Sequence, residues 1–256
     1  MKRLWLHALS LVMMGLVILV AAVLSSTMVD LGLFALMMVP IGPTVPLAVG
    51  LTGLVGYMRE GVIREDMLHT MGLVMSLGLT VAALPETAIS IVYPLPDTAQ
   101  FQFAVALLQV PVMLLWAIGV VGYVFIFNRV VPASRPKTTA AVLATILGLI
   151  IFTIKTLVSL FIPPPDAVLA TICGFLALCL AVIVGSVTAL LWHFRTGKMR
   201  IPLILMLFAM IILLSLNIGW CSSLVSPLHP MIRGLTAEAY LALGLSLTIL
   251  SRIDEA

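Results

Sequence analysis

The sequence predicts an all-α, polytopic membrane protein, a bundle of apolar helices that cross a lipid bilayer. Of the 256 residues, 62% are hydrophobic and only 9% are charged, whereas soluble domains carry about 25% charged residues. The mean hydropathy is +1.27. Backbone groups cannot stay unpaired in lipid, so apolar segments there must form helices or closed barrels. The apolar runs of this chain are much longer than the roughly 10 residues of a barrel strand, and they therefore predict helices.

Eight apolar segments approach or exceed the length of about 20 residues that a helix needs to cross a bilayer. Only short connectors separate them, so we expect residues 1–256 to form a single transmembrane domain. In chain order, the expected spans are 4–26, 31–57, 67–93, 100–127, 139–162, 167–192, 201–226 and 236–251.

The short connectors also exclude several functions. They leave no room for a soluble domain that would bind a nucleotide or nucleic acid, and we expect neither an enzyme nor a cofactor. No metal site is predicted, because the chain contains no His-Glu-x-x-His and no Cys-x-x-Cys motif. Three cysteines lie in expected helices, and we interpret them as small buried apolar side chains: Cys173, Cys179 and Cys221.

The first helix, within residues 1–30, has two interpretations. Lys2 and Arg3 precede a long apolar segment that ends in AAVLSS (residues 21–26), which is also the pattern of a secretory signal peptide. If the segment is retained, it is the first of eight spans. If it is cleaved, the mature protein has seven spans and its N-terminus lies outside.

The basic residues predict which side of the membrane each loop faces. Cytoplasmic loops are enriched in lysine and arginine, and eleven of the thirteen basic residues fall at the termini or at alternate loops. We therefore expect a multi-pass cell-membrane protein with both termini in the cytosol, whose basic cytosolic loops could contact other membrane subunits. Arg233 falls on the opposite side, and Lys155 falls within a span. The other eleven are Lys2, Arg3, Arg59, Arg64, Arg129, Arg135, Lys137, Arg195, Lys198, Arg200 and Arg252.

The second expected helix is interrupted by the sequence PIGPTVP (residues 40–46). Pro43 and Pro46 each lack the backbone N–H that a helix would use, so each frees a carbonyl one turn earlier. Inside a membrane, a freed carbonyl needs a neighbouring side chain, a water molecule or a cavity. We therefore expect a kinked helix beside a polar site.

Two stretches of the chain align with each other without a gap and share a pattern of residues. ETAISIVYPLPD (residues 86–97) and KTLVSLFIPPPD (residues 155–166) have a threonine, a serine, two prolines and an aspartate at the same spacing, and GWCSSLVSPLHP (residues 219–230) keeps the serine and one proline. We interpret this pattern as a tandem repeat of helical hairpins in one orientation, in which prolines end the outgoing helices. The hairpins would be 31–97, 98–166 and 167–230, followed at 231–256 by the last helix and a short cytosolic tail.

The first two copies begin with opposite charges, Glu86 and Lys155. Each charge lies eight residues before a proline that ends its helix, about 12 Å below the outer surface at 1.5 Å per residue. A lone charge at this depth costs about 2.5–3.5 kcal/mol, and an ion pair between neighbouring repeats would offset that cost. We predict a Glu86–Lys155 pair, with Gln109 and Asn217 as the polar lining around it.

An intramembrane ion pair favours two classes of function. The first is transport or conduction of a small solute or ion, in which Glu86 responds to a proton or cation and Lys155 supplies the counter-charge or contacts an anion. The second is a non-enzymatic accessory protein or a sensor, similar in topology to the membrane part of bacterial seven-helix sensors. In this second class the pair only fixes the register of two helices.

Residues 50–93, with GLTGLVGYMREG at the start and LPETAISIVY at the end, resemble the ion-carrying hairpin of rotary ATPase ring subunits. The family carries a proton or sodium ion on a carboxylate, and the resemblance implies that Glu86 is that carboxylate. The chain departs from the family in two ways. Its second expected helix has prolines where ring packing needs a ladder of glycines, and the next hairpin has Lys155, which could not carry a cation, at the matching position.

Overall fold

The structure is a computed structural model, and it describes residues 2–27, 32–61, 67–92, 99–130, 143, 145–150, 152–154, 157, 166–194, 196–221 and 229–252. Throughout these residues the regular structure is helical, without strands. Six of the described helices are long and apolar enough to cross a membrane. The predicted fold class, an all-α bundle of apolar helices, is therefore confirmed. The number of spans, the orientation of the termini and the repeats stay predictions.

The chain begins with α1 (Lys2–Thr27), whose described apolar part is Leu9–Leu24. The fifth predicted span, 139–162, is described only in part, by helical residues at 143, 145–150, 152–154 and 157. Within it, Gly148 lies against Ala181 of α6. The six helices that could cross a membrane are α2 (Gly32–Gly61), α3 (Met67–Val92), α4 (Ala99–Val130), α6 (Asp166–His193), α7 (Arg200–Cys221) and α8 (Pro230–Ser251).

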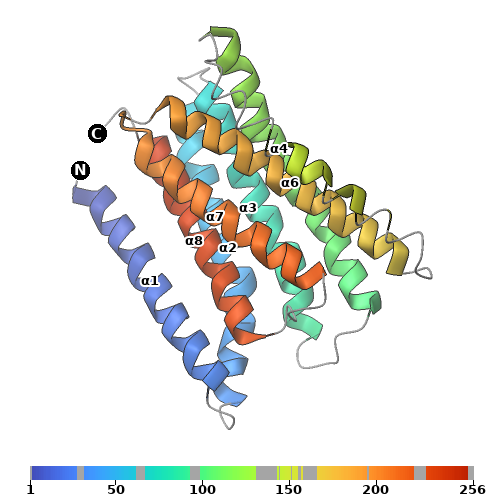
Figure 1. Cartoon of the computed structure of the whole chain (residues 1–256). Helices are drawn as coiled ribbons and strands as arrows, with labels where there is room; N and C mark the ends of the chain where they lie inside the picture. Colours follow the sequence, from blue (N-terminus) through green and yellow to red (C-terminus); the bar gives the residue numbers. More distant parts are fainter. Residues whose placement is uncertain are drawn as a thin grey trace.

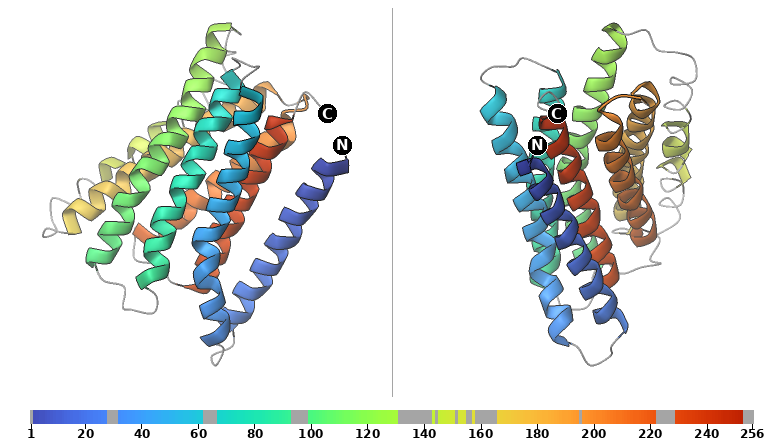
Figure 2. Two further views of the ribbon diagram at one scale, coloured as in Figure 1. Left: turned by 180° about the vertical axis from the view of Figure 1, so that it is seen from behind. Right: turned by 90° about the vertical axis from the view of Figure 1, so that its left-hand side faces the viewer.

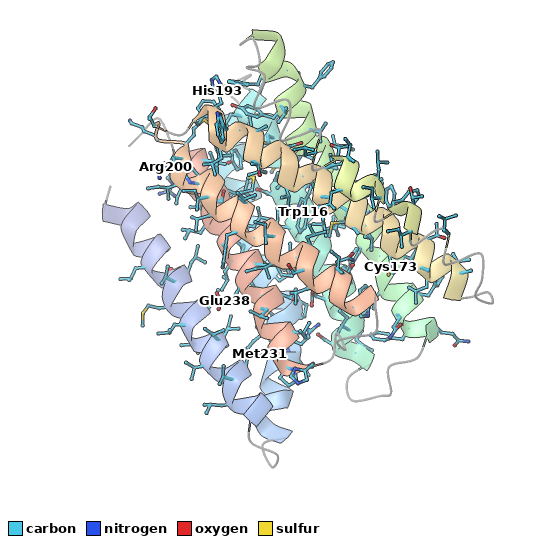
Figure 3. The ribbon with its side chains drawn as sticks, viewed as in Figure 1. Trp116, Cys173, His193, Arg200, Met231 and Glu238 are labelled. Carbon is cyan, nitrogen blue, oxygen red and sulfur yellow. The ribbon has the colours of Figure 1, made fainter. Side chains whose placement is uncertain are left out.

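The start of α1 and the end of α8 lie at the same end of the bundle (Figure 1, Figure 2). His193 and Arg200, at the turn between α6 and α7, lie toward this end, whereas Met231, at the start of α8, lies toward the opposite end (Figure 3). We call these the terminal end and the far end of the bundle.

Six helices close into a ring. Each helix packs against the next in the order α2, α3, α4, α6, α7, α8, and α8 packs back against α2. A further contact between α3 and α8 crosses the ring and divides it. As a result, α3, α4, α6, α7 and α8 surround one interior space, and α2 covers the other side of the α3–α8 contact.

Two buried aromatic side chains tie the ring together through backbone carbonyls. Trp116 of α4 donates from Nε1 to the carbonyl of Met75 on α3 at 3.2 Å. Tyr57 of α2 donates from its hydroxyl to the carbonyl of Leu247 on α8 at 2.9 Å. Tyrosine and tryptophan bury large apolar surfaces but need a partner for their polar atom when they are buried. These bonds hold α3 against α4, and α2 against α8, and so help to position the interior space.

Helix α1 lies outside the ring and packs on α8 and α2. Its contact face is made of small or buried residues, with Gly15 against the carboxyl of Glu238 on α8 and with Ile18 and Ala22 buried. Without α1, the Glu238 carboxyl would lie on an outer surface of the bundle that faces lipid, which is costly for a charged group. Whether α1 is retained or cleaved as a signal peptide stays a prediction.

Replacing Gly15 with leucine should separate α1 from α8, because a side chain at this position would meet Glu238 Oε2 at 2.7 Å. Overpacking of this kind costs about 1–3 kcal/mol, so we expect a lower unfolding midpoint in detergent micelles. Val17→Leu is the matched control, because Val17 on the same helix is 64% exposed and a larger apolar side chain there would face lipid. Equal midpoints for the two variants would contradict the described α1–α8 contact.

Candidate functional site

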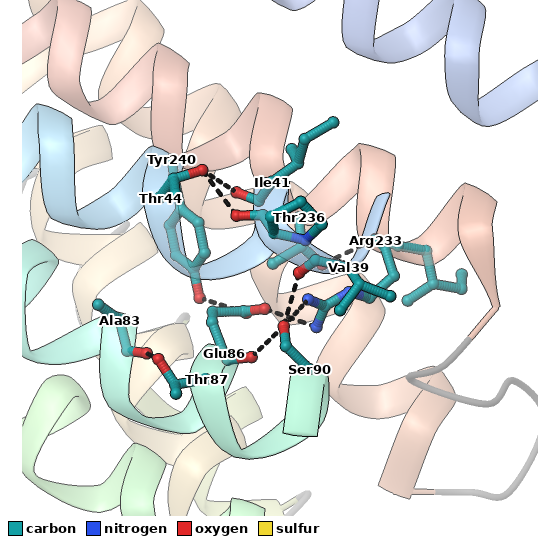
Figure 4. Close-up of polar contacts among 12 residues, drawn as sticks. Val39, Ile41, Thr44, Ala83, Glu86, Thr87, Ser90, Arg233, Thr236 and Tyr240 are labelled. Atoms are coloured by element: carbon teal, nitrogen blue, oxygen red, sulfur yellow. Dashed lines mark hydrogen bonds and ion pairs between the residues drawn. The ribbon is translucent and has the colours of Figure 1, made fainter. Parts of the chain in front are cut away.

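Glu86 on α3 forms an ion pair with Arg233 on α8 in the interior of the bundle (Figure 4). Arg233 Nη1 donates to Glu86 Oε2 at 2.8 Å, and the two side chains are only 7% and 4% exposed. An isolated charge buried to this extent would lose its hydration with nothing in return. Each residue therefore supplies the counter-charge that the other requires.

Two hydroxyl groups add further hydrogen bonds to this pair. Tyr240 donates from its hydroxyl to Glu86 Oε1 at 3.1 Å, and Arg233 Nη2 donates to Ser90 Oγ at 3.1 Å. Tyr240 follows Arg233 by two turns of α8, and Ser90 follows Glu86 by one turn of α3, so each helix presents both of its residues on one face. The geometry holds α3 and α8 in a fixed register.

The proline-rich part of α2 is bonded to the same site. Pro43 has no N–H to donate to the carbonyl of Val39 one turn earlier, and Ser90 of α3 donates its hydroxyl to that carbonyl at 2.7 Å. The same hydroxyl oxygen accepts the bond from Arg233. The expectation that a carbonyl freed by proline would need a polar neighbour is thus met at Val39.

Gly42, between the prolines of α2, provides the space for the arginine head group. A Cβ at this position would overlap the guanidinium of Arg233 and would lie 3.0 Å from Glu86 Oε2. Only a residue without a side chain lets the backbone of α2 approach the ion pair this closely. The sequence PIGPTVP therefore contributes both a freed carbonyl and a gap to the site.

A cavity of about 70 Å³ lies beside the ion pair in the space enclosed by α3, α4, α6, α7 and α8. About 10–15 Å³ of such space is needed for one water molecule, so the cavity has room for several waters or one small solute. Its walls are mainly apolar. The polar side chains that line it are Glu86, Gln109, Asn217, Trp220, Arg233, Thr236 and Tyr240.

Two of the lining groups have no hydrogen-bond partner among the described residues. They are Asn217 Oδ1 and Trp220 Nε1, both buried on α7. The two residues are one helical turn apart and therefore share a face of α7. Buried polar atoms are normally satisfied by protein or by ordered water. Both residues line the cavity, and the two atoms themselves have almost no accessible surface, so a solute or water would satisfy them after a small movement of the side chains.

The structure brings three of the four predicted site residues to one cavity: Glu86, Gln109 and Asn217. The fourth, Lys155, lies outside the described residues, and its place in the site stays a prediction. The cation that is bonded to Glu86 is Arg233, whereas the sequence pattern pairs Glu86 with Lys155. The buried ion pair thus exists at Glu86, and its described partner differs from the predicted one.

Sequence reasoning missed Arg233 because it placed the last span at 236–251, which leaves Arg233 in an outer loop. Helix α8 begins earlier, at Pro230, and His229 caps it by accepting a hydrogen bond from the Met231 N–H. Proline is favoured in the first turn of a helix. That signal, together with a single arginine on the side of the membrane that basic residues avoid, could have placed Arg233 inside the helix.

No protein-family model, no curated protein and no solved structure matches this chain. Across the part of the chain that the structure describes, no group of three histidine, cysteine, aspartate or glutamate side chains could hold a metal ion. The functional interpretation therefore depends on the geometry of the cavity and of the ion pair.

Proposed function

We propose that this integral membrane protein transports or conducts a small solute or ion, and that the cavity beside Glu86 and Arg233 is its binding site. The observation that carries the proposal is a buried, hydrogen-bonded ion pair on the wall of a cavity that is also lined by two residues with polar atoms unpaired among the described residues. Intramembrane charged residues commonly mark a substrate or ion pathway.

The depth of the site supports access from one side of the membrane. Glu86 lies six residues before the end of α3, and Arg233 lies three residues after the start of α8, so the pair is about 5–9 Å from the far end of the bundle at 1.5 Å per residue. A solute has a shorter path to this cavity from the far end of the bundle than from the terminal end. The site would therefore take up its solute at the far end.

The charge distribution supports an orientation in the cell membrane with the terminal end in the cytosol. Lys198, Arg200 and Arg252 lie at or next to helix ends on the terminal side, as cytoplasmic basic residues do.

Cys173 of α6 is disulfide-bonded, so the interpretation of all three cysteines as free packing residues is wrong for Cys173. This cysteine lies in the half of α6 next to the far end, and disulfides persist on the oxidising side of a cell membrane.

A second function, that of an accessory or sensor protein with a purely architectural ion pair, is favoured by one specific observation. Both carboxylate oxygens of Glu86 and both terminal nitrogens of Arg233 already have partners inside the protein. Such a closed arrangement is well suited to fixing α3 against α8. Buried pairs can specify helix register in this way even when they add little stability.

Flux measurements on reconstituted protein separate the two functions. We expect liposomes that contain the wild-type protein to pass at least one of urea, guanidinium and nitrate faster than empty liposomes, as measured by stopped-flow light scattering. The double variant Glu86→Gln with Arg233→Met keeps an acceptor for Tyr240 but removes both charges. It should reduce the flux about tenfold or more, because hydrogen bonds to charged groups contribute about 1.5–3 kcal/mol.

The amount of reconstituted protein and its unfolding midpoint are measured in parallel. If the double variant is as stable as the wild type and transports at the wild-type rate, the ion pair is architectural. If wild-type liposomes are no more permeable than empty ones to any of the three probes or to water, the transport proposal fails.

A further inference from the structure

We infer that the solute of this cavity is a small uncharged molecule that carries a hydrogen-bond donor and acceptor close together, such as an amide, a urea or a short alcohol. This inference rests on the proposed function, and it names the class of substrate. It is carried by three independent properties of the cavity wall: its balance of charge, its unpaired polar atoms and its apolar surface.

Among the described residues, the charges that line the cavity cancel. Glu86 and Arg233 are the only acidic and basic residues on its described wall, and they are bonded to each other at 2.8 Å. An ion that entered would lose its hydration and would find no uncompensated counter-charge, which is strongly unfavourable in a medium of low polarity. An uncharged solute does not incur this cost.

The unpaired atoms on α7 specify the hydrogen bonds of the solute. Trp220 Nε1 can only donate, and Asn217 Oδ1 can only accept, so a complementary solute accepts from the first and donates to the second. Side chains one turn apart on a helix have Cβ atoms about 5–6 Å apart. A carbonyl and an amine on the same carbon, or a single hydroxyl, supply both kinds of hydrogen bond within one small solute. Gln109, half-buried on α4, adds a third polar contact on another wall.

The remaining walls limit the size and polarity of the solute. Val112 and Met113 of α4, Leu180 of α6 and Leu213 of α7 are buried apolar residues that line the cavity. They offer no hydrogen bonds to a strongly hydrated molecule, but they suit a methyl group or the face of a planar amide. A volume of about 70 Å³ restricts the solute to a few non-hydrogen atoms.

Urea, guanidinium and nitrate make a matched set of probes, because all three are small, planar and similar in shape but differ in charge. We expect proteoliposomes to pass urea, and its methyl relative acetamide, faster than empty liposomes, and to pass guanidinium and nitrate at the rate of empty liposomes. Selective flux of guanidinium or nitrate would overturn the inference and would leave the transport function standing. Raised permeability to water alone would overturn it as well.

Two variants test the hydrogen bonds themselves. Trp220→Phe keeps an aromatic ring but removes the donor, and Asn217→Leu keeps the approximate volume but removes the acceptor. Each should lower urea flux about threefold to tenfold, the loss expected for one hydrogen bond. Trp192→Phe is the matched control, because Trp192 on α6 is 52% exposed and does not line the cavity. Wild-type urea flux in both cavity variants, at unchanged unfolding midpoints, would overturn the assignment of these contacts.

Discussion

Replacing Arg233 with methionine should lower the free energy of unfolding by about 3–5 kcal/mol, the usual cost of removing one partner from a buried ion pair. The variant leaves the carboxylate of Glu86 buried without its counter-charge, and it also removes the bond from Nη2 to Ser90. Of the described side-chain donors, only Tyr240 would remain bonded to the Glu86 carboxylate. One neutral hydrogen bond cannot compensate a buried charge.

The measurement is equilibrium unfolding of the purified protein in mixed detergent micelles, followed by circular dichroism. Arg200→Met is the matched control, because Arg200 is an exposed arginine at the start of α7, and surface changes of this kind stay within about 0.5 kcal/mol. Adding Glu86→Gln to Arg233→Met should recover most of the lost stability, since the pair is then replaced rather than broken. No recovery in the double variant would show that the destabilisation does not come from the unpaired carboxylate.

The sequence predicted which polar residues line the site better than it predicted which of them are bonded to one another. Glu86 is an acid within an apolar helix, and this fact alone required a counter-charge and polar neighbours at the same depth. Gln109 and Asn217 were predicted as neighbours on that argument, and both line the cavity with Glu86. The same argument could not predict that the cation bonded to Glu86 is Arg233. A depth argument depends on helix boundaries, and the six-residue difference between 236 and Pro230 at the start of α8 moved Arg233 from a loop into the bundle.

The contacts that close the ring were also not predictable. Soluble helices have one apolar stripe that shows which face is packed, but these helices are apolar on nearly every face. Leu84 on α3, for instance, is 56% exposed, whereas its neighbour Ala83 is buried. The sequence pattern therefore predicts that helices form but not that α8 packs against α2 and α3. Both contacts join segments that are far apart in the chain, and the contact between α3 and α8 closes one side of the cavity.

Replacing Gly42 with alanine should destabilise the protein by about 1–3 kcal/mol, the cost of overpacking a filled interior. A Cβ at Gly42 overlaps the guanidinium of Arg233 and approaches Glu86 Oε2 to 3.0 Å. The ion pair would have to move away from α2, and the bond from Ser90 to the carbonyl of Val39 would be disturbed with it. We therefore expect a lower unfolding midpoint, and lower flux in the same liposome assay.

Gly122→Ala on α4 is the matched control, because a Cβ at Gly122 meets no atom within 4 Å. Alanine is favoured over glycine within a helix by about 0.5–1 kcal/mol, so this variant should be as stable as the wild type or more stable. The two glycine-to-alanine changes should thus have opposite signs.

A double-mutant cycle shows whether the guanidinium is the cause. In the Arg233→Met background the head group that the new Cβ would strike is absent, and an unbranched methionine can move aside. The penalty of Gly42→Ala should therefore largely vanish, with a coupling energy of about 1–3 kcal/mol between the two positions. An equal penalty in both backgrounds would place the conflict elsewhere in α2. Strong coupling would establish that the gap in the proline-rich segment of α2 exists to accommodate the arginine, and that α2, α3 and α8 form one unit around the ion pair.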